Sequence, residues 1–300
     1  MRGKIITADL KVIDRILRQV LGSSDYIDVE RMGGLTNRTY KTVFSDGRQM
    51  VVRIPGEGTE ELIVRADEKV STELAWKLGI DGELLYFGED GIKVTCCIPD
   101  AVTMSDEKMR EAEHIRQAAA VLHKLHSCGA DTKVLFEVFE MAQGYEKIIE
   151  RNHVAMYPDY DLVKSKVLKI KKEIDAVCGI HKVPCHNDPL CENWILSGSG
   201  ELYLIDWEYA GMNDGIWDLA DISIEAGYSP KLDELILTEY LGSTPTQTDW
   251  KHFLANKLYV DYLWTLWAKA RVPYDGQSME NWAFERYERL KKNIAVFEKI

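Results

Sequence analysis

The segment 186–193, with the sequence HNDPLCEN, holds the residue types best suited to chemistry. Asp188 is followed five positions later by Asn193, a spacing that fits a tight loop in which the two side chains meet around a metal ion and a hydroxyl group. The aspartate can orient or deprotonate an attacking hydroxyl, and the asparagine oxygen can ligate Mg²⁺. A capped turn is the alternative for any single pair with this spacing.

A second acidic residue strengthens this interpretation. Asp206 comes thirteen residues after Asn193, at the end of the apolar run 202–205. A carboxylate at the end of a buried strand is well placed to hold Mg²⁺ at nucleotide phosphates. The compound pattern of His-x-Asp-x4-Asn, hairpin and Asp-Trp-Glu is much rarer by chance than its parts, and it follows the order of a kinase catalytic loop and metal-binding aspartate. The pattern predicts phosphoryl transfer.

The N-terminal part of the chain contains residues that could bind the phosphates. Gly33 and Gly34 would let the backbone approach a phosphate closely, and Thr36 or Asn37 could add hydrogen-bond donors. A plain hairpin turn is the alternative for this segment.

One basic residue stands in an apolar strand of the same part of the chain. Arg53, in the run 51–54, suits pairing with phosphate oxygens, unless it alternates outward to solvent. Glu68, on the following helix, could hold Arg53 in an ion pair, with Glu73 as its competitor.

The elements that must position these residues change in character along the chain. A first helix is expected at 9–21 and a second at 61–78. Around them lie four β-like runs, at 26–32, 39–44, 50–54 and 92–98.

From Ser105, a suitable N-cap, one helix is expected to run through Leu125 because apolar residues recur every three or four positions. Later helices are expected at 136–150, 161–178, 231–241, 248–270 and 279–299, and short β-like runs at 193–196 and 202–205. The fold class predicted is α+β: a small β-rich N-terminal lobe, residues 1–98, and a larger mainly helical C-terminal lobe, residues 99–300. Ligand sites are expected at the junction of the two lobes.

Composition limits the partners and the compartment. Asp and Glu number 49 against 37 Lys and Arg, a net charge of −12, which disfavours nucleic acid as a partner. No apolar run approaches the roughly 20 residues of a membrane span. The six cysteines form no CxxC pair, so we expect free thiols rather than a zinc site. Together with the lack of a signal-peptide pattern, this predicts a cytoplasmic protein, and the sequence indicates no protein partner.

The acceptor of the phosphoryl group can be narrowed further. Only eleven residues separate Asp206 from Asp218, too few for a segment that docks a polypeptide, so a small-molecule hydroxyl is expected. Seven of the eight tryptophans follow residue 190, and Trp264 and Trp267 share one helix face. Aromatic faces can hold a quaternary ammonium at about 0.5–2 kcal/mol each, although ordinary core packing is the alternative.

These motifs together resemble the choline/ethanolamine kinase family, within the aminoglycoside-phosphotransferase and protein-kinase-like superfamily. The resemblance to bacterial choline kinases runs almost end to end. It is carried by residues 33–40, 52–56, Arg65 with Glu68, 186–193, 205–214 and 217–220. It implies a bilobal protein-kinase-like fold, in which Arg53 replaces the usual lysine.

The resemblance also implies roles for individual residues. Asp188 would be the catalytic base, and His186 would orient its loop. Asn193 and Asp206 would ligate Mg²⁺, with Glu208 as a further contact. ATP would be bound by a set of residues comprising Gly34, Thr36, Asn37, Arg53 and Glu68 at the phosphates and Cys97 and Ile98 near the adenine. The acceptor would be enclosed by Trp264, Trp267, Trp282 and Glu225, with Tyr209 as a possible addition.

The function expected from this resemblance is transfer of the γ-phosphate of ATP to the hydroxyl of choline, which gives phosphocholine. Ethanolamine, thiamine or an aminoglycoside are alternative acceptors. A non-catalytic pseudokinase is a remote alternative, because Asp188, Asn193 and Asp206 are all present. The spacing of His123 and His126 would also allow metal binding, but packing or helix capping is the preferred interpretation.

Overall fold

A computed structural model describes residues 5–32, 37–56 and 63–299. The chain forms two compact units: Met1–Met104 with Glu192–Ala210, and Ser105–Cys191 with Gly211–Ile300. The predicted lobes, residues 1–98 and 99–300, stay a prediction about domain organisation.

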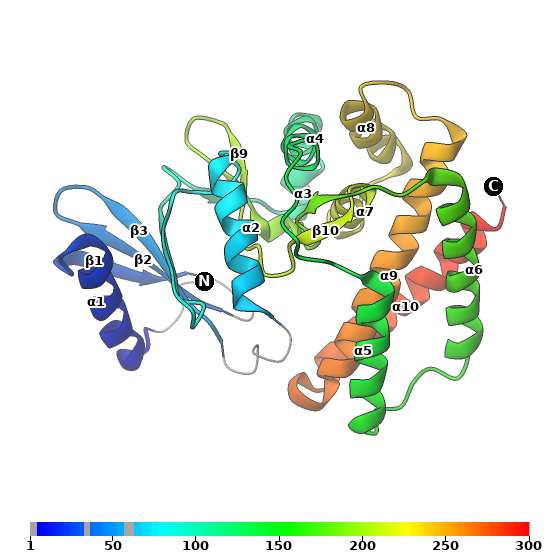
Figure 1. The fold of residues 1–300 in the computed structure, drawn as a ribbon, viewed down its shortest axis with the longest axis horizontal. Helices are drawn as coiled ribbons and strands as arrows, with labels where there is room; N and C mark the ends of the chain where they lie inside the picture. The colour runs from blue at the N-terminus through cyan, green and yellow to red at the C-terminus, as the bar shows by residue number, and fades with distance from the viewer. Residues whose placement is uncertain (1–4, 33–36, 57–62, 300) are drawn as a thin grey trace. The chain divides into compact units, whose positions relative to one another are not determined.

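The first unit is built on an antiparallel five-stranded sheet with the order β1-β2-β3-β5-β4 (Figure 1). Its strands are β1 (Tyr26–Arg31), β2 (Arg38–Phe44), β3 (Gln49–Ile54), β4 (Leu84–Phe87) and β5 (Lys93–Cys96). Two helices, α1 (Thr7–Leu21) and α2 (Arg65–Lys77), complete this part. A smaller sheet, with the order β6-β8-β9, joins β6 (Val102–Thr103) to β8 (Trp194–Leu196) and β9 (Leu202–Leu204).

The core of the first unit lies between α1 and the sheet. Ile13 and Leu17 are one turn apart on α1 and fully buried, and they belong to one cluster with Tyr40 of β2 and Val52 of β3. The side chains of β2 point alternately to the two faces of the sheet, and from Tyr40 to Phe44 every second residue is buried. This pattern is typical of a sheet covered on one face. A hairpin turn that contains Asp46 and Gly47 joins β2 to β3 and fixes their register.

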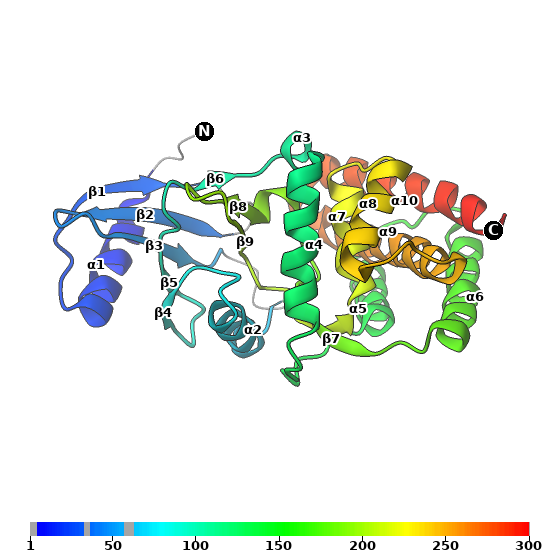
Figure 2. The same ribbon diagram turned by 90° about the horizontal axis from the view of Figure 1, so that it is seen from above.

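The second unit is mainly helical (Figure 2). Its helices are α3 (Asp106–Met109), α4 (Ala112–His126), α5 (Val138–Arg151), α6 (Tyr160–Cys178), α7 (Ile216–Glu225), α8 (Pro230–Leu241), α9 (Gln247–Asp275) and α10 (Gln277–Phe297). The strands β7 (Lys182–Cys185) and β10 (Gly211–Asp214) pair antiparallel.

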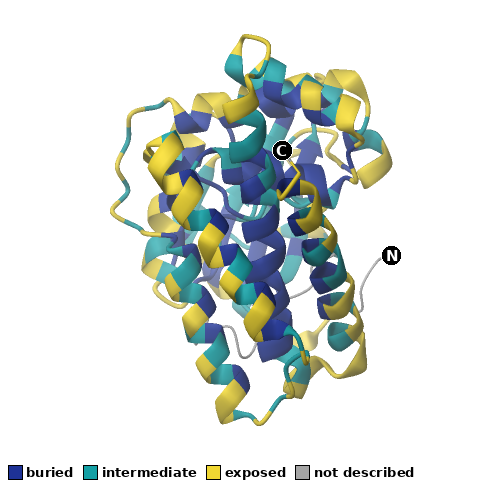
Figure 3. Ribbon diagram, turned by 90° about the vertical axis from the view of Figure 1, so that its right-hand side faces the viewer, coloured by how far each residue is buried: buried dark blue, intermediate teal, exposed yellow. Residues whose placement is uncertain are grey.

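Helix α9 is the centre of this unit. Every residue from 258 to 266 is buried, and α9 packs against α5, α6, α7 and α10 (Figure 3). A helix that is buried on all sides belongs to a core. It starts with a capping box, in which Thr246 and Asp249 exchange hydrogen bonds. Helices packed around α9 therefore fix the positions of the side chains that it carries.

Most predicted elements are confirmed with shifted ends, and some are wrong. The single helix expected after Ser105 is two helices: Ser105 caps the short α3, and the chain breaks at 110–111 before α4. The predicted start of α2 at residue 61 is also wrong, because residues 63 and 64 precede the helix. Sequence patterns did not predict β4, β6, β7 or β10. Within the described residues, no helix combines the length and apolar character needed to cross a membrane.

Candidate active site

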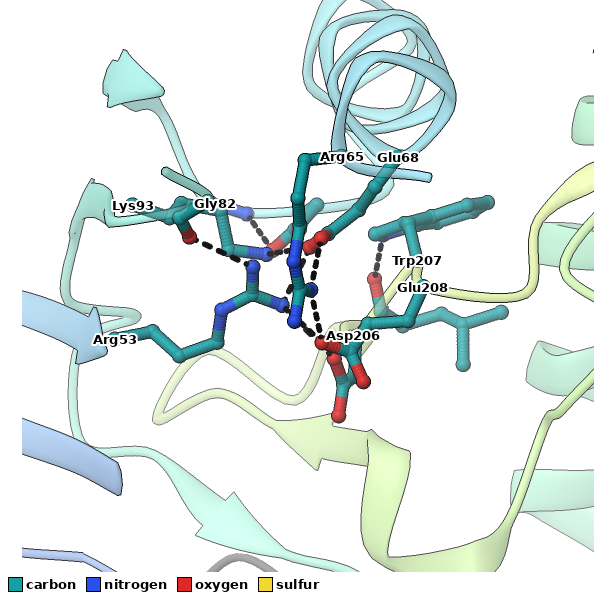
Figure 4. A network of polar contacts seen from close by, with 11 residues as sticks. Arg53, Arg65, Glu68, Gly82, Lys93, Asp206, Trp207 and Glu208 are labelled. Carbon is teal, nitrogen blue, oxygen red and sulfur yellow. Dashed lines mark hydrogen bonds and ion pairs between the residues drawn. The ribbon is translucent and has the colours of Figure 1, made fainter. Parts of the chain in front are cut away.

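A buried arginine organises the candidate nucleotide site of the first unit (Figure 4). Arg53 of β3 is 5% exposed, and its Nη1 forms an ion pair with Glu68 of α2. The same Nη1 lies 3.2 Å from Glu208 Oε1 and 3.4 Å from Asp206 Oδ1. The predicted pair of Arg53 with Glu68 is therefore confirmed, whereas Glu73 contacts Lys77 at 4.0 Å on an exposed face.

A second arginine joins this cluster. Arg65, the first residue of α2, places Nη1 2.8 Å from Glu68 Oε2 and 2.6 Å from Glu208 Oε1. Burial alone would raise the pKa of Glu68, but the charges of Arg53 and Lys93, together with hydrogen bonds from Arg53 and Arg65, more than offset it, so the pKa lies below its usual range. Burial, and then the charge of Asp206, raise the pKa of Glu208. Two guanidinium groups thus partly neutralise three carboxylates.

The same carboxylates are arranged as ligands for a hard cation. One oxygen each from Glu68, Asp206 and Glu208 lies within 4.8 Å of the others. Carboxylate oxygens are the ligands that Mg²⁺ prefers. Asp206 adopts a φ of +70°, in the left-handed region that non-glycine residues seldom enter. Such a conformation persists when the surrounding structure holds it, and it is often found at functional sites.

The hairpin of β8 and β9 brings the two predicted metal ligands together. Trp194 pairs with Leu204, and the N–H of Ile205 donates to the carbonyl of Asn193 at 2.9 Å. Asn193 and Asp206 therefore stand at the same end of one hairpin, although thirteen residues separate them. This agrees with their predicted role, which stays a prediction.

The structure describes only some of the other residues that were predicted to bind the nucleotide. Gly34 and Thr36 lie outside the described residues. Asn37 is 7% exposed, and neither polar atom of its amide has a hydrogen-bond partner among the described residues. Cys97 and Ile98 follow β5, and the N–H of Cys97 already donates to the carbonyl of Gln49. An adenine contact there would have to use other groups of this segment.

In the second unit, a buried aspartate holds the loop that carries Asp188. The two carboxylate oxygens of Asp218 accept the backbone N–H groups of His186 and Asn187, each at 2.8 Å. His126 Nε2 contacts Asp218 Oδ2 at 3.0 Å, and its Nδ1 contacts the hydroxyl of Tyr240. His126 is therefore part of this polar network, beyond the packing or capping role expected from the sequence.

Further hydrogen bonds fix the same loop from the side of Asn187, which adopts a φ of +68°. Its carbonyl accepts Trp217 Nε1 at 3.0 Å, and its side chain bonds to Asn213 and to the carbonyl of Gly211. The N–H of Asp188 donates to Nδ1 of the buried His186 at 3.3 Å. The loop is thus held rigidly while the Asp188 side chain stays partly exposed.

The predicted aromatic residues of the second unit form one cluster. Trp264 and Trp267 of α9 meet edge to face, with ring centroids 6.1 Å apart. Trp267 meets Trp282 of α10 at 6.0 Å, also edge to face. Edge-to-face packing is the favoured geometry of aromatic pairs. The grouping of these three residues was expected, whereas Tyr209 lies in the first unit and its part in the cage stays a prediction.

An arginine that the sequence did not single out for a role also belongs to this cluster. The guanidinium of Arg286 lies 4.0 Å from the ring centroid of Trp282 and forms an ion pair with Glu225. Asp261 of α9, fully buried, contacts Arg286 at 3.4 Å and Arg289 at 2.6 Å. Glu225 is therefore already paired with an internal cation.

Comparison with known proteins decides the family. The model of the choline/ethanolamine kinase family matches residues 29–272. The chain belongs to this family. It is thus an ATP-dependent phosphotransferase with a protein-kinase-like fold, as the sequence predicted.

Solved structures agree over nearly the whole chain. A choline/ethanolamine kinase family protein of Mesorhizobium loti is 31% identical, with a TM-score of 0.83 over 96% of this chain and 95% of that one. The choline kinase LicA of Streptococcus pneumoniae is 30% identical, with a TM-score of 0.82 over 97% of this chain and 100% of that one. LicA has also been solved in complex with AMP. Protein LicA of Haemophilus influenzae is 28% identical, and the match covers 89% of this chain and 79% of that protein.

Proposed function

We propose that the protein transfers the γ-phosphoryl group of ATP to the hydroxyl of choline and releases phosphocholine. The observation that carries the choice of acceptor is the cluster of Trp264, Trp267 and Trp282, next to which Arg286 already rests as a cation. A quaternary ammonium has no N–H to donate, so aromatic faces are its main binding partners. Membership in the choline/ethanolamine kinase family supports this assignment.

The proposal assigns the nucleotide to the first unit. Nε of Arg53 has no hydrogen-bond partner among the described residues, so it is available as a donor to a phosphate oxygen. Its Nη1 is held by Glu68, which keeps the guanidinium in place. Asp206 and Glu208, with Asn193, would hold Mg²⁺, since all three offer oxygen ligands and two of them are already clustered. The ion would supply positive charge against the phosphates during transfer.

The proposal assigns the acceptor to the second unit. Asp188 would accept the proton of the choline hydroxyl as the oxygen attacks the γ-phosphorus. The loop anchored by Asp218 would keep this carboxylate in one position, so that transfer needs little rearrangement. The use of ATP fits the cytoplasmic location expected from the sequence.

The test is ADP release by the purified protein with ATP and Mg²⁺, measured with choline, ethanolamine, thiamine and kanamycin. Turnover should be highest with choline, and Asp188→Asn should reduce kcat by about 10²- to 10⁴-fold. Near-full turnover by Asp188→Asn would refute the assignment of the base. A clear preference for another acceptor would refute choline but leave the kinase chemistry intact.

A second variant tests the aromatic cluster. Trp267→Leu removes the ring that contacts both other tryptophans, and it should raise KM for choline by about 2- to 30-fold, the equivalent of 0.5–2 kcal/mol. Trp250→Leu is the matched control, because Trp250 lies on the same helix but packs on Phe253 instead. Equal effects of the two substitutions on KM would mean that Trp267 serves only the core.

A further inference from the structure

Helix α7 carries three acidic residues on one face, and no described residue forms a hydrogen bond with the carboxylate of the middle one. Asp218, Asp221 and Glu225 are spaced by three and four positions, so their side chains follow one another along the helix. Asp218 accepts backbone N–H groups and Glu225 pairs with Arg286. Asp221 is 0% exposed, and within the described residues neither of its carboxylate oxygens has a hydrogen-bond partner.

A carboxyl group in this state requires an explanation. Burying an ionised carboxylate without a partner is so unfavourable that such a group normally binds a proton instead. Burial raises the pKa of Asp221 well above its usual range, and the charges of Glu225 and Asp188 raise it further. The charge of Arg286 acts in the opposite direction and does not offset them.

The neighbouring cations are already engaged by other carboxylates. Arg286 of α10 pairs with Glu225 of α7 and with Asp261 of α9, and Arg289 of α10 pairs with Asp261. The charged groups that interact with Asp221 come from three elements. They are Asp218 and Glu225 on α7, Asp188 on the loop after β7, and Arg286 and Arg289 on α10. None of the described cations among them is committed to Asp221.

We propose that Asp221 couples acceptor binding to proton release: it carries a proton in the free protein, and the cation of the acceptor displaces that proton. The inference rests on the proposed function, because it requires a cationic alcohol as the ligand. Asp221 interacts with both the predicted base, Asp188, and the predicted cage residue, Glu225. On binding, the O–H bond of the carboxyl breaks, the proton leaves to bulk water, and the buried carboxylate balances the charge of the acceptor's cation.

This assignment changes which acid attracts the acceptor. Glu225 is largely neutralised by Arg286, so it has little charge left for a second cation. A quaternary ammonium gains nothing from a neutral carboxyl, because it cannot donate a hydrogen bond, but it gains from a buried carboxylate without a cation of its own. Binding of the cation therefore favours ionisation of Asp221, and ionisation of Asp221 in turn strengthens binding of the cation.

Isothermal titration calorimetry of the full-length protein with choline tests this inference. Titrations at one pH in phosphate, HEPES and Tris give the number of protons released, because these buffers differ in ionisation enthalpy. Choline itself does not ionise in this range, so the protons come from the protein. We expect release of up to one proton per choline, and a Kd that falls as the pH rises, by at most about tenfold per pH unit, over the range in which the free protein keeps Asp221 protonated.

Two variants locate the source of the proton. Asp221→Asn keeps the shape of the protonated acid, so it should bind choline more weakly, release no proton and show a Kd independent of pH. Trp267→Leu, which removes an aromatic face but no charge, should bind choline more weakly but keep the proton release of the wild type. Circular dichroism and melting check that each variant folds, and Asp221→Ser replaces Asp221→Asn if the latter does not.

The outcomes separate this inference from the proposed function. Choline binding by the wild type without any proton release would overturn the role of Asp221 alone. Unchanged proton release in Asp221→Asn would do the same. A wild-type protein that binds no choline at any pH would instead refute the proposed function, and the inference with it.

Discussion

Replacing Arg53 by Met should reveal how much of the stability of the first unit depends on one buried cation. Its Nη1 contacts three carboxylates, and its Nη2 donates to the carbonyl of Gly91 at 3.1 Å. Removing one partner of a buried ion pair costs about 3–5 kcal/mol, because the remaining charge is left uncompensated. Arg65 still pairs with Glu68 and Glu208 in the variant. We therefore expect the lower end of this range, about 3 kcal/mol at pH 7.5.

The loss of stability in Arg53→Met should depend on pH, and the structure predicts the direction of that dependence. In the wild type the pKa of Glu68 lies below its usual range, so its stabilising contribution is present above the pKa of the unfolded chain and disappears as the pH falls through the lower, folded value. Without Arg53, burial would instead raise the pKa of the same carboxylates, and protonation would relieve their repulsion. The difference in free energy of unfolding between wild type and variant should therefore shrink from pH 7.5 to pH 5.

Urea denaturation can be monitored by hydrogen exchange in peptides that cover β2 and β3, and it then reports the stability of the first unit directly. The midpoint should fall by about 1 M urea or more at pH 7.5. Arg48→Met is the matched control, since Arg48 precedes β3 but is about half exposed, and it should leave the midpoint unchanged. Adding Mg²⁺ should recover part of the loss, because three clustered carboxylates without Arg53 attract a divalent cation more strongly. A loss below 1 kcal/mol, or one that grows as the pH falls, would refute this reasoning.

Three further substitutions or modifications have equally definite outcomes. Asp218→Asn removes an acceptor from the N–H groups of the loop, so steady-state kinetics should show a kcat at least about tenfold lower with little change in KM for ATP. Circular dichroism and melting must show a folded variant, because partial unfolding would also lower the apparent kcat. Burial raises the pKa of Asp81 to about 6, above its value in the unfolded chain, so wild-type stability falls as the pH rises between the two values. Asp81→Asn should therefore stabilise the protein by roughly 1–3 kcal/mol at pH 7.5 and hardly at all near pH 4, as thermal melting at both values would show. Burial also raises the pKa of the Cys185 thiol, so mass spectrometry after iodoacetamide at pH 8 should find Cys185 unmodified in the native protein, and rapid labelling there would contradict its burial.

The sequence predicted residues whose role depends on their chemical type. Arg53 and Glu68 are paired as expected from the ion pair that kinases use to position their basic strand residue. Trp264 and Trp267 meet as helix periodicity indicated, and Trp282 joins them, as the family resemblance implied. Elements with strong periodicity, such as α1 and α5, were also predicted.

Residues whose role depends on distant partners were not predicted. Arg65 contacts Glu208 across 143 positions, and Arg286 contacts Glu225 across 61. Nothing local in the sequence marks such pairs. Short strands such as β7 and β10 were not predicted, because their few residues are stabilised by pairing with each other rather than by their own β propensity. The break between α3 and α4 lacks a proline or glycine that would have indicated it.

The division of the chain has a consequence for the order in which the protein can fold during synthesis. Residues 192–210 belong to the first unit, so its smaller sheet and its acidic cluster remain incomplete until the ribosome has passed residue 210. Until then Glu68 is the one buried counter-charge among the described residues that pairs with Arg53 and Arg65, and about half of the helical unit, residues 105–191, emerges between the two parts of the first. Closing a loop of this length is slow, because its entropy must be lost before the contacts form. Residues 1–104 expressed alone would therefore form the five-stranded sheet without the hairpin that carries Asp206 and Glu208. If the chain is expressed as two fragments, activity should return only when the fragment that contains residues 192–210 can still pair with β6.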